Sequence, residues 1–73
     1  EEGDDVEEKH ADVGSLLAKQ RQQLHLSQAE LSIRSGVRQC NISRIERGDA
    51  VPNVLTLEKL AHGMGKKLLI QFI

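Results

Sequence analysis

The feature that most constrains the fold is a pair of short helical segments separated by one glycine. Residues 27–35 open with Ser-Gln-Ala-Glu, which fits a capping box. In this motif the Ser27 side chain accepts from a free amide, while Glu30 reaches back to the amide of Ser27 itself. Gly36 then breaks the helix, because glycine adopts helix-ending conformations readily. The pattern predicts a helix over 27–35, with Leu31 and Ile33 facing inward, followed by a tight turn.

The segment after the turn, Val37–Gly48, is the candidate functional element. Ile42 and Ile45 are three residues apart and therefore share one face of a helix. The amino end and the opposite face hold polar or basic residues: Arg38, Gln39, Cys40, Ser43, Arg44 and Arg47. Arg and Gln side chains match base edges in the major groove of DNA. An ordinary amphipathic surface helix is the alternative, but two short helices around a Gly-containing turn have the form of a helix-turn-helix.

Two further helices are expected on either side of this unit. Residues 12–24 form the first, with its apolar stripe made of Val13, Leu16, Leu17 and Leu24. Residues 54–63 form the last, with Asn53 as its N-cap. Its stripe repeats at helical spacing through Leu57, Leu60, Ala61 and Met64.

Residues 66–73 change to a period of two. Leu68, Ile70 and Phe72 alternate with other side chains, which predicts a strand. A lone apolar strand has no partner within the chain, so we expect it to pair with the same strand of a second copy across a two-fold axis. A fifth helix or a disordered end is the alternative.

The charges are segregated along the chain. Residues 1–13 hold seven acids and one lysine, a net charge of −6, whereas residues 14–73 hold nine Lys or Arg and four acids, a net charge of +5. We expect residues 1–11 to be disordered or a frayed lead-in to the first helix. The net positive charge of residues 14–73 favours binding to a polyanion. We interpret the acidic arm as a solvated tail. The alternative is that the arm competes with DNA for the basic face of the domain.

Size and composition limit the remaining possibilities. A chain of 73 residues with one Phe and no Trp or Tyr makes one small domain with an aliphatic core, for which dimerisation is a natural source of further burial. One cysteine forms no internal disulfide. With no signal-peptide pattern and no long apolar run, we expect a cytoplasmic protein with no membrane partner. A start at Glu1 instead of Met is compatible with a fragment of a longer protein.

Three fragments at mutually consistent spacing carry a family resemblance: LLAKQRQQLHLSQAEL, GVRQCNISRIERG and PNVLTLEKLAHGMG. From about Val13 to Met64 the chain resembles a Cro/cI-type, or XRE-type, helix-turn-helix domain. The resemblance implies an all-α, four-helix domain over residues 12–65, after the acidic arm at 1–11 and before the dimerisation strand at 66–73. The strand-like end is similar to antitoxin-type members.

The resemblance also implies roles for individual residues. Gln28 would contact a DNA phosphate, and Arg38, Gln39 and Cys40 would occupy base-reading positions. Arg44 and Arg47 would reach bases or phosphates, and Asn41 and Ser43 would touch the backbone or face solvent. Arg21 and Glu46 would form an ion pair that links the first helix to the third.

The function that these expectations favour is a repressor that binds a near-palindromic operator in double-stranded DNA as a homodimer. The alternative is an antitoxin that neutralises a toxin protein and regulates its own operon. We expect no enzymatic activity, cofactor or metal, because His10, His25 and His62 lack metal-ligand spacing and no nucleophile–base pair stands out. A redox switch at Cys40 remains an open alternative.

Overall fold

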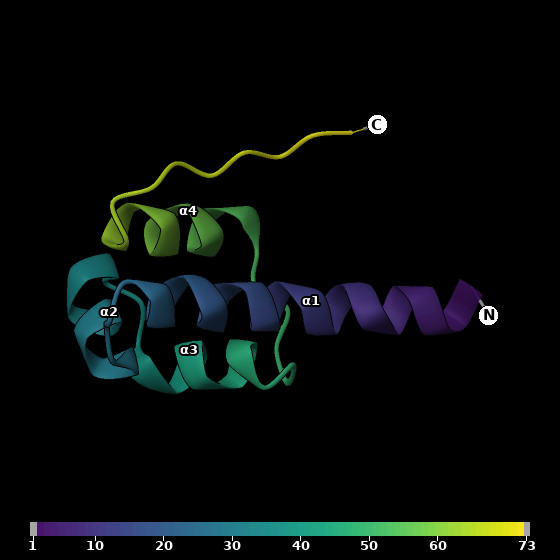
Figure 1. Ribbon diagram of the computed structural model, residues 1–73, viewed down its shortest axis with the longest axis horizontal. Coiled ribbons are helices and arrows are strands. Elements are labelled where there is room, and N and C mark those ends of the chain that lie inside the picture. Colours follow the sequence, from purple (N-terminus) through teal and green to yellow (C-terminus); the bar gives the residue numbers. More distant parts are fainter. Residues whose placement is uncertain (1, 73) are drawn as a thin grey trace.

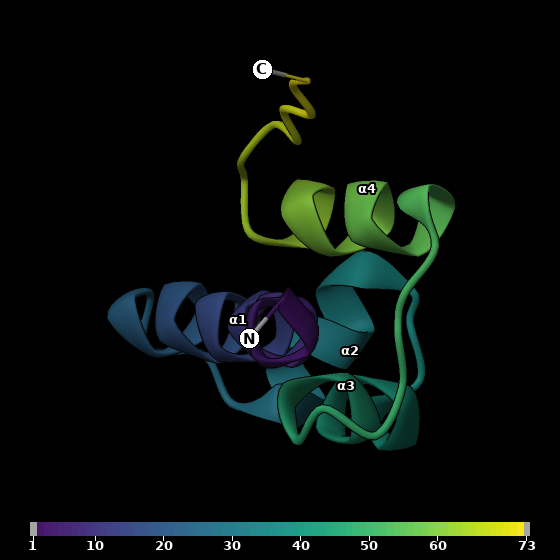
Figure 2. The same cartoon turned by 90° about the vertical axis from the view of Figure 1, so that its right-hand side faces the viewer.

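Four helices make up the part of the chain that the structure describes. The computed structural model describes the backbone of residues 2–72 and the side chains of residues 13–72. The helices are α1 (Glu2–Gln23), α2 (Gln28–Ser35), α3 (Gln39–Glu46) and α4 (Val54–Gly63). The long α1 has α3 along one side and α4 along the other, and α2 lies near its carboxyl end (Figure 1). A view along α1 gives the same arrangement, so the all-α prediction is confirmed for the described residues (Figure 2).

The core takes its side chains from all four helices. Leu31 of α2, Ile42 of α3 and Leu60 of α4 are fully buried. They pack with three more buried residues, namely Leu17, Val37 and Ile45. The helix α2 packs against both α3 and α4, while α1 packs against α3. The pair α2–α3 is therefore held from both sides, which fixes the direction in which the outer face of α3 points.

The boundaries of α2 and α4 follow from local hydrogen bonds, as predicted. The Ser27 side chain accepts from the amide of Glu30 at 3.0 Å, and Glu30 accepts from the amide of Ser27 at 2.8 Å. Gly36 follows α2 with a φ of +79°, which favours glycine. Asn53 caps α4 by accepting from the amide of Thr56 at 2.8 Å. The capping box and the Asn53 cap are therefore both confirmed.

The first helix differs from its prediction. It begins at Glu2 instead of Asp12, so its predicted start was wrong: the backbone of residues 2–11 leads into the helix in a helical conformation instead of forming a disordered arm. Acidic residues stabilise the amino end of a helix through its dipole, and Glu is a good helix former. Although α1 has 22 residues, neither it nor any other helix of the described part combines the length and apolar character needed to cross a membrane.

The expected apolar stripe of α1 is only partly buried. Leu17 is 6% exposed, but Leu16 is 58% exposed and Val13 and Leu24 lie near 40%. Ile33 of α2, which was expected to face inward, is 84% exposed. Helical spacing selects a face, but the neighbouring helices decide how much of that face is covered. The short α2 covers the core with Leu31 alone.

The backbones of α1 and α3 lie close together at Gly14. A methyl group at this position would overlap the carbonyl oxygen of Ile45, and it would lie 3.0 Å from that of Glu46. Glycine therefore allows the backbone of α1 to approach the last turn of α3 directly.

Residues 66–72 leave α4 without forming a strand or a fifth helix. Gly65, with a φ of +72°, turns the chain back over α4, and the amide of Lys66 donates to Ala61 at 2.8 Å (Figure 1). The predicted strand is thus not formed in the single chain. A strand needs a partner for its backbone groups, and the described residues offer none. Ile73 lies outside the described residues.

Candidate nucleic-acid interface

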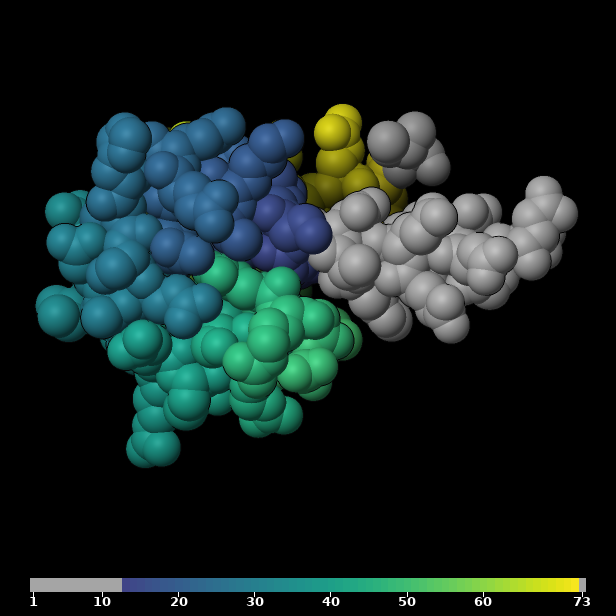
Figure 3. Space-filling view, turned by 60° about the horizontal axis from the view of Figure 1, so that its bottom comes forward, coloured from purple at the N-terminus to yellow at the C-terminus, as the bar shows by residue number. Residues whose placement is uncertain are grey.

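One face of α3 is fully available to a ligand. Ile42 and Ile45 anchor the helix in the core. Of the predicted site residues on the other side, Ser43 is half-buried. The others are exposed, namely Arg38, Gln39, Cys40, Asn41, Arg44 and Arg47. The residues of α2, α3 and the following loop form one continuous surface, coloured from blue to green in Figure 3. The structure therefore gathers on one surface the residues that the sequence placed there.

The amino end of α3 has no side-chain cap. Arg38 occupies the cap position with an extended backbone (φ −61°, ψ 141°), and its carbonyl accepts from the amides of Asn41 and Ile42. The first amides of a helix lack intrahelical acceptors, and they form a partly positive end. Since no side chain caps α3, this end can receive an acceptor from a ligand, with Arg38 and Gln39 beside it.

The three arginines of α3 differ in how free they are. Arg47 donates to Ser43 Oγ at 2.6 Å and to Asp49 Oδ2 at 3.0 Å. The Arg47–Asp49 side chains are more than half exposed, so this pair is weak and solvent-screened. Within residues 13–72, Arg38 and Arg44 make no side-chain hydrogen bond. Arg44 and Arg38 can thus engage a ligand without breaking an existing contact.

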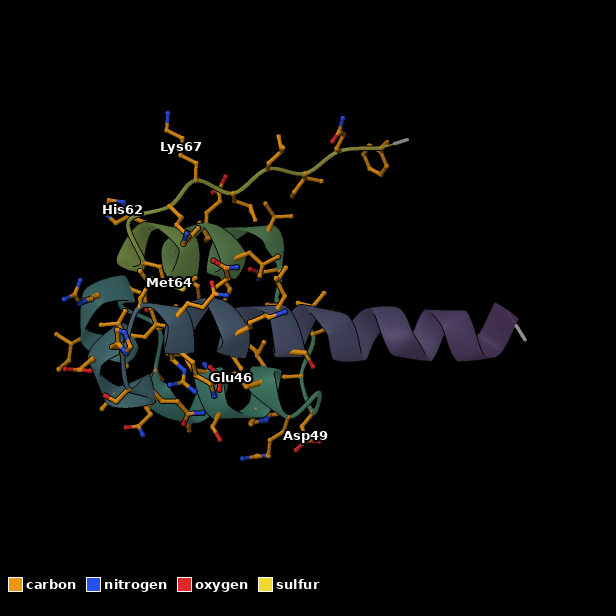
Figure 4. The ribbon with its side chains drawn as sticks, in the orientation of Figure 1. Glu46, Asp49, His62, Met64 and Lys67 are labelled. Carbon is orange, nitrogen blue, oxygen red and sulfur yellow. The ribbon has the colours of Figure 1, made fainter. Side chains whose placement is uncertain are left out.

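Glu46 lies on the inner side of α3, toward α1 (Figure 4). Its Oε2 accepts from Arg21 Nε at 2.8 Å, and its Oε1 accepts from Arg21 Nη2 at 3.0 Å. Arg21 Nη1 also donates to the carbonyl of Leu26 at 2.8 Å. The Arg21 and Glu46 side chains are only 12% and 8% exposed. The ion pair implied by the resemblance is therefore present, and it is two-pronged and largely shielded from water.

Gln28 joins the same group, which sequence reasoning did not anticipate. Its Nε2 donates to Glu46 Oε1 at 2.9 Å. The two residues are 18 positions apart, and no local pattern signals their contact. Glu46 thus ties the first residue of α2 to the last turn of α3. A second N–H of the Gln28 amide group remains for another acceptor.

These contacts change the acidity of Glu46. Burial raises the pKa of this carboxyl, but hydrogen bonds from Arg21 and Gln28, together with the Arg21 charge, outweigh burial and hold the pKa below its usual value. The hydrogen bond with Glu46 raises the pKa of Arg21 further. Both groups are therefore charged near neutral pH, and the Glu46 charge is neutralised internally. The outer face of α3 and its ends therefore keep the positive charges of Arg38, Arg44 and Arg47, which are exposed.

The remaining candidate residues are Cys40 and the side chains that could bind a metal. Cys40 is exposed, and its Sγ lies 4.0 Å from Asn41 Oδ1, which is a long contact. In the part of the chain that the structure describes, no group of three or more His, Cys, Asp or Glu side chains is arranged to hold a metal ion.

Comparison with known proteins agrees with this geometry. The family described as "Helix-turn-helix" matches residues 17–70, most of the chain. The chain belongs to the Cro/cI-type (XRE-type) helix-turn-helix family. A relative from Haemophilus influenzae, described as an uncharacterized HTH-type transcriptional regulator, is 48% identical over 74% of this chain and 55% of its own length. Another of the same description, from Sinorhizobium fredii, is 43% identical over 73% of this chain and 69% of its own.

The match to the Haemophilus helix-turn-helix relative spans little more than half of that protein. No solved structure matches the chain significantly.

Proposed function

We propose that this helix-turn-helix protein is a DNA-binding transcriptional regulator, and specifically a repressor that binds a near-palindromic operator as a homodimer. The observation that supports this most is the outer face of α3, where Arg38, Gln39 and Arg44 are exposed on an anchored helix. The acids nearest to them are already paired, Glu46 with Arg21 and Asp49 with Arg47. The descriptions of the two relatives as transcriptional regulators also support it.

The roles follow from side-chain chemistry. Gln39 can pair with both edge groups of adenine, and Arg38 or Arg44 can pair with guanine in the same two-pronged way. The amino ends of α2, α3 and α4 can seat phosphates, aided by the free N–H of Gln28. Cys40, Asn41, Ser43 and Arg47 surround this centre and contact the backbone or neighbouring bases. Counterion release by the arginines would make binding strongly salt-dependent.

A homodimer formed through residues 66–73 would present two copies of α3 related by a two-fold axis, and so favour a two-fold operator whose half-sites are about 34 Å, or one turn of DNA, apart. The first experiment is selection from a randomised duplex pool with sequencing of the bound fraction, at two salt concentrations. An enriched two-fold motif with salt-sensitive affinity supports the proposal. Absence of any enriched motif contradicts it.

Arg44→Ala tests the base-reading role directly. Loss of one two-pronged base contact costs about 1–3 kcal/mol, so we expect operator affinity to fall roughly 10- to 100-fold. The free energy of unfolding should change by no more than about 0.5 kcal/mol, because Arg44 is exposed. Lys59→Ala, which removes one positive charge from exposed α4, is the matched control. Equal operator affinity for wild type and Arg44→Ala would refute the role.

The antitoxin reading remains the second candidate. Exposed apolar residues at the start of α4 favour a protein partner, since Val51, Val54 and Leu55 are each more than half exposed. Co-purification with the product of an adjacent toxin-like gene would support this reading. Retention of that product by a Leu55→Asp variant would argue against the α4 surface as its binding site.

A further inference from the structure

An apolar groove runs between α1, α4 and the tail formed by residues 66–72. It has a volume of about 510 Å³. Val13 and Leu16 line it from α1, Leu57 from α4, and Leu68, Leu69 and Ile70 from the tail. Leu16 is 58% exposed and Ile70 is 53% exposed, so the groove is open and incompletely filled by its own chain. Figure 4 shows Met64 and Lys67 near the turn where the tail begins.

The tail also presents apolar side chains that its own chain leaves largely exposed. Phe72 is 98% exposed, is the only aromatic residue of the chain, and does not line the groove. Leu69 is 81% exposed. A small protein rarely leaves a Phe and a neighbouring open groove unpartnered, because together they expose a large apolar area to water. The groove and Phe72 therefore suggest two halves of one contact.

The symmetry of strand pairing brings these halves together. If the tail becomes a strand, Leu68, Ile70 and Phe72 share one face, because side chains alternate. In an antiparallel pair across a two-fold axis at Ile70, residue 70 lies opposite itself and residue 72 lies opposite residue 68. Leu68 is the half-buried tail residue that lines the groove. The partner's Phe72 would therefore arrive beside the groove.

We propose that the α1–α4 groove is the docking site for Phe72 of a second copy, which seats itself there as the two tails pair antiparallel about Ile70. This rests on the homodimer of the proposed function and assigns its interface. Each copy gives one Phe and receives one, so the contact is closed and self-complementary.

Cysteine cross-linking tests the register in a Cys40→Ser background, which removes the exposed native thiol. Ile70→Cys should form disulfide-linked dimers under mild oxidation, because residues that face each other across the axis fall within disulfide range. Leu69→Cys is the matched control and should not cross-link, since residue 69 lies opposite residue 71. Cross-linking of Leu69→Cys in place of Ile70→Cys would overturn the register and with it the placement of Phe72.

Sedimentation equilibrium tests the contact itself. Phe72→Ala should weaken the dimer roughly 100-fold, because two central aromatic anchors are lost per dimer. Leu16→Ala should weaken the dimer also. Because the proposed contact joins these two side chains, the double variant should lose less dimer affinity than the sum of the two single losses. Ile33→Ala, which removes an exposed apolar side chain from α2, should leave the dimer unchanged.

The outcomes separate the two proposals. A wild-type dimer whose affinity Phe72→Ala does not alter would overturn the groove contact, while a two-fold operator could still be found. A monomeric wild type would overturn the groove contact and the homodimer together. Absence of any selected DNA motif, with Phe72-dependent dimers, would overturn the proposed function and leave the groove contact standing.

Discussion

At the scale of single residues, Glu46 connects three helices. It binds Arg21 of α1 and Gln28 of α2 from its place on α3. Because Arg21 and Glu46 are both shielded from water, removing the negative charge leaves a guanidinium with an incomplete partner. The group that orients α3 is therefore an internal ion pair rather than apolar packing alone.

Glu46→Gln should lower the free energy of unfolding by about 2–3 kcal/mol at pH 7. The pKa of Glu46 is lowered in the folded state. Its charge therefore stabilises the fold fully above the unfolded pKa of about 4.3, and this stabilisation is lost as the pH falls through the folded pKa.

The difference between wild type and Glu46→Gln should thus shrink as the pH falls below the unfolded pKa of about 4.3, where the unfolded wild type takes up a proton, and it should disappear once the folded wild type is protonated as well. Urea unfolding from pH 3 to pH 7 measures it. Glu58→Gln, an exposed carboxylate on α4, serves as the control and should have little effect. A difference that stays constant across this pH range would contradict the assigned role.

Gly14→Ala should destabilise the fold in spite of the higher helix propensity of alanine. Propensity favours Ala by about 1 kcal/mol, but the new methyl would overlap the Ile45 carbonyl and push α1 from α3, which costs about 1–3 kcal/mol. We expect a net loss of up to about 2 kcal/mol in the free energy of unfolding, measured by thermal unfolding. Ser15→Ala, at the exposed neighbouring position, is the control and should be neutral or slightly stabilising.

At the scale of elements, the helix ends decide where each segment turns. The carboxyl ends of α1 and α3 are followed by the same pair of backbone hydrogen bonds. Leu26 donates to Arg21 and His25 to Gln22, just as Asp49 donates to Arg44 and Gly48 to Ile45. This is a Schellman motif, whose central residue takes a left-handed conformation. Gly48 has a φ of +82° and His25 a φ of +59°.

Opposite substitutions at these two helix ends should therefore have opposite effects. Gly48→Ala should destabilise the fold by about 1–2 kcal/mol, because a Cβ is disfavoured in this conformation. His25→Gly should stabilise it by about 0.5–1 kcal/mol, since relief of the left-handed conformation exceeds the added chain entropy. Chemical denaturation measures both. A destabilising His25→Gly would show that the imidazole makes a stabilising contact.

At the scale of the whole molecule, the open groove and the unpaired tail argue for self-association. If the folded state is a dimer and the unfolded state is not, the melting temperature must rise with protein concentration. Ile70→Asp places a charge on the pairing face, so this variant should melt at a temperature independent of concentration. Differential scanning calorimetry over a hundredfold concentration range measures the dependence. A concentration-independent wild type would contradict dimerisation through the tail.

The sequence by itself determined the features that depend on neighbours along the chain. Ser27, Glu30, Gly36 and Asn53 act on amides within a few residues, so the bounds of α2 and α4 followed from local chemistry. Ile42 and Ile45, spaced at the helical period, indicated which side of α3 faces the core. The family resemblance supplied the Arg21–Glu46 pair.

Only the tertiary structure decided the features that depend on residues distant in sequence. The hydrogen bond from Gln28 to Glu46, the approach of Gly14 to Ile45 and the exposure of Ile33 all arise from how the helices pack. Helical periodicity cannot foresee them, because it describes one helix and not the area that its neighbours cover. Whether the tail forms a strand depends on a second chain, because a strand needs a partner for its backbone groups and a single chain does not supply one.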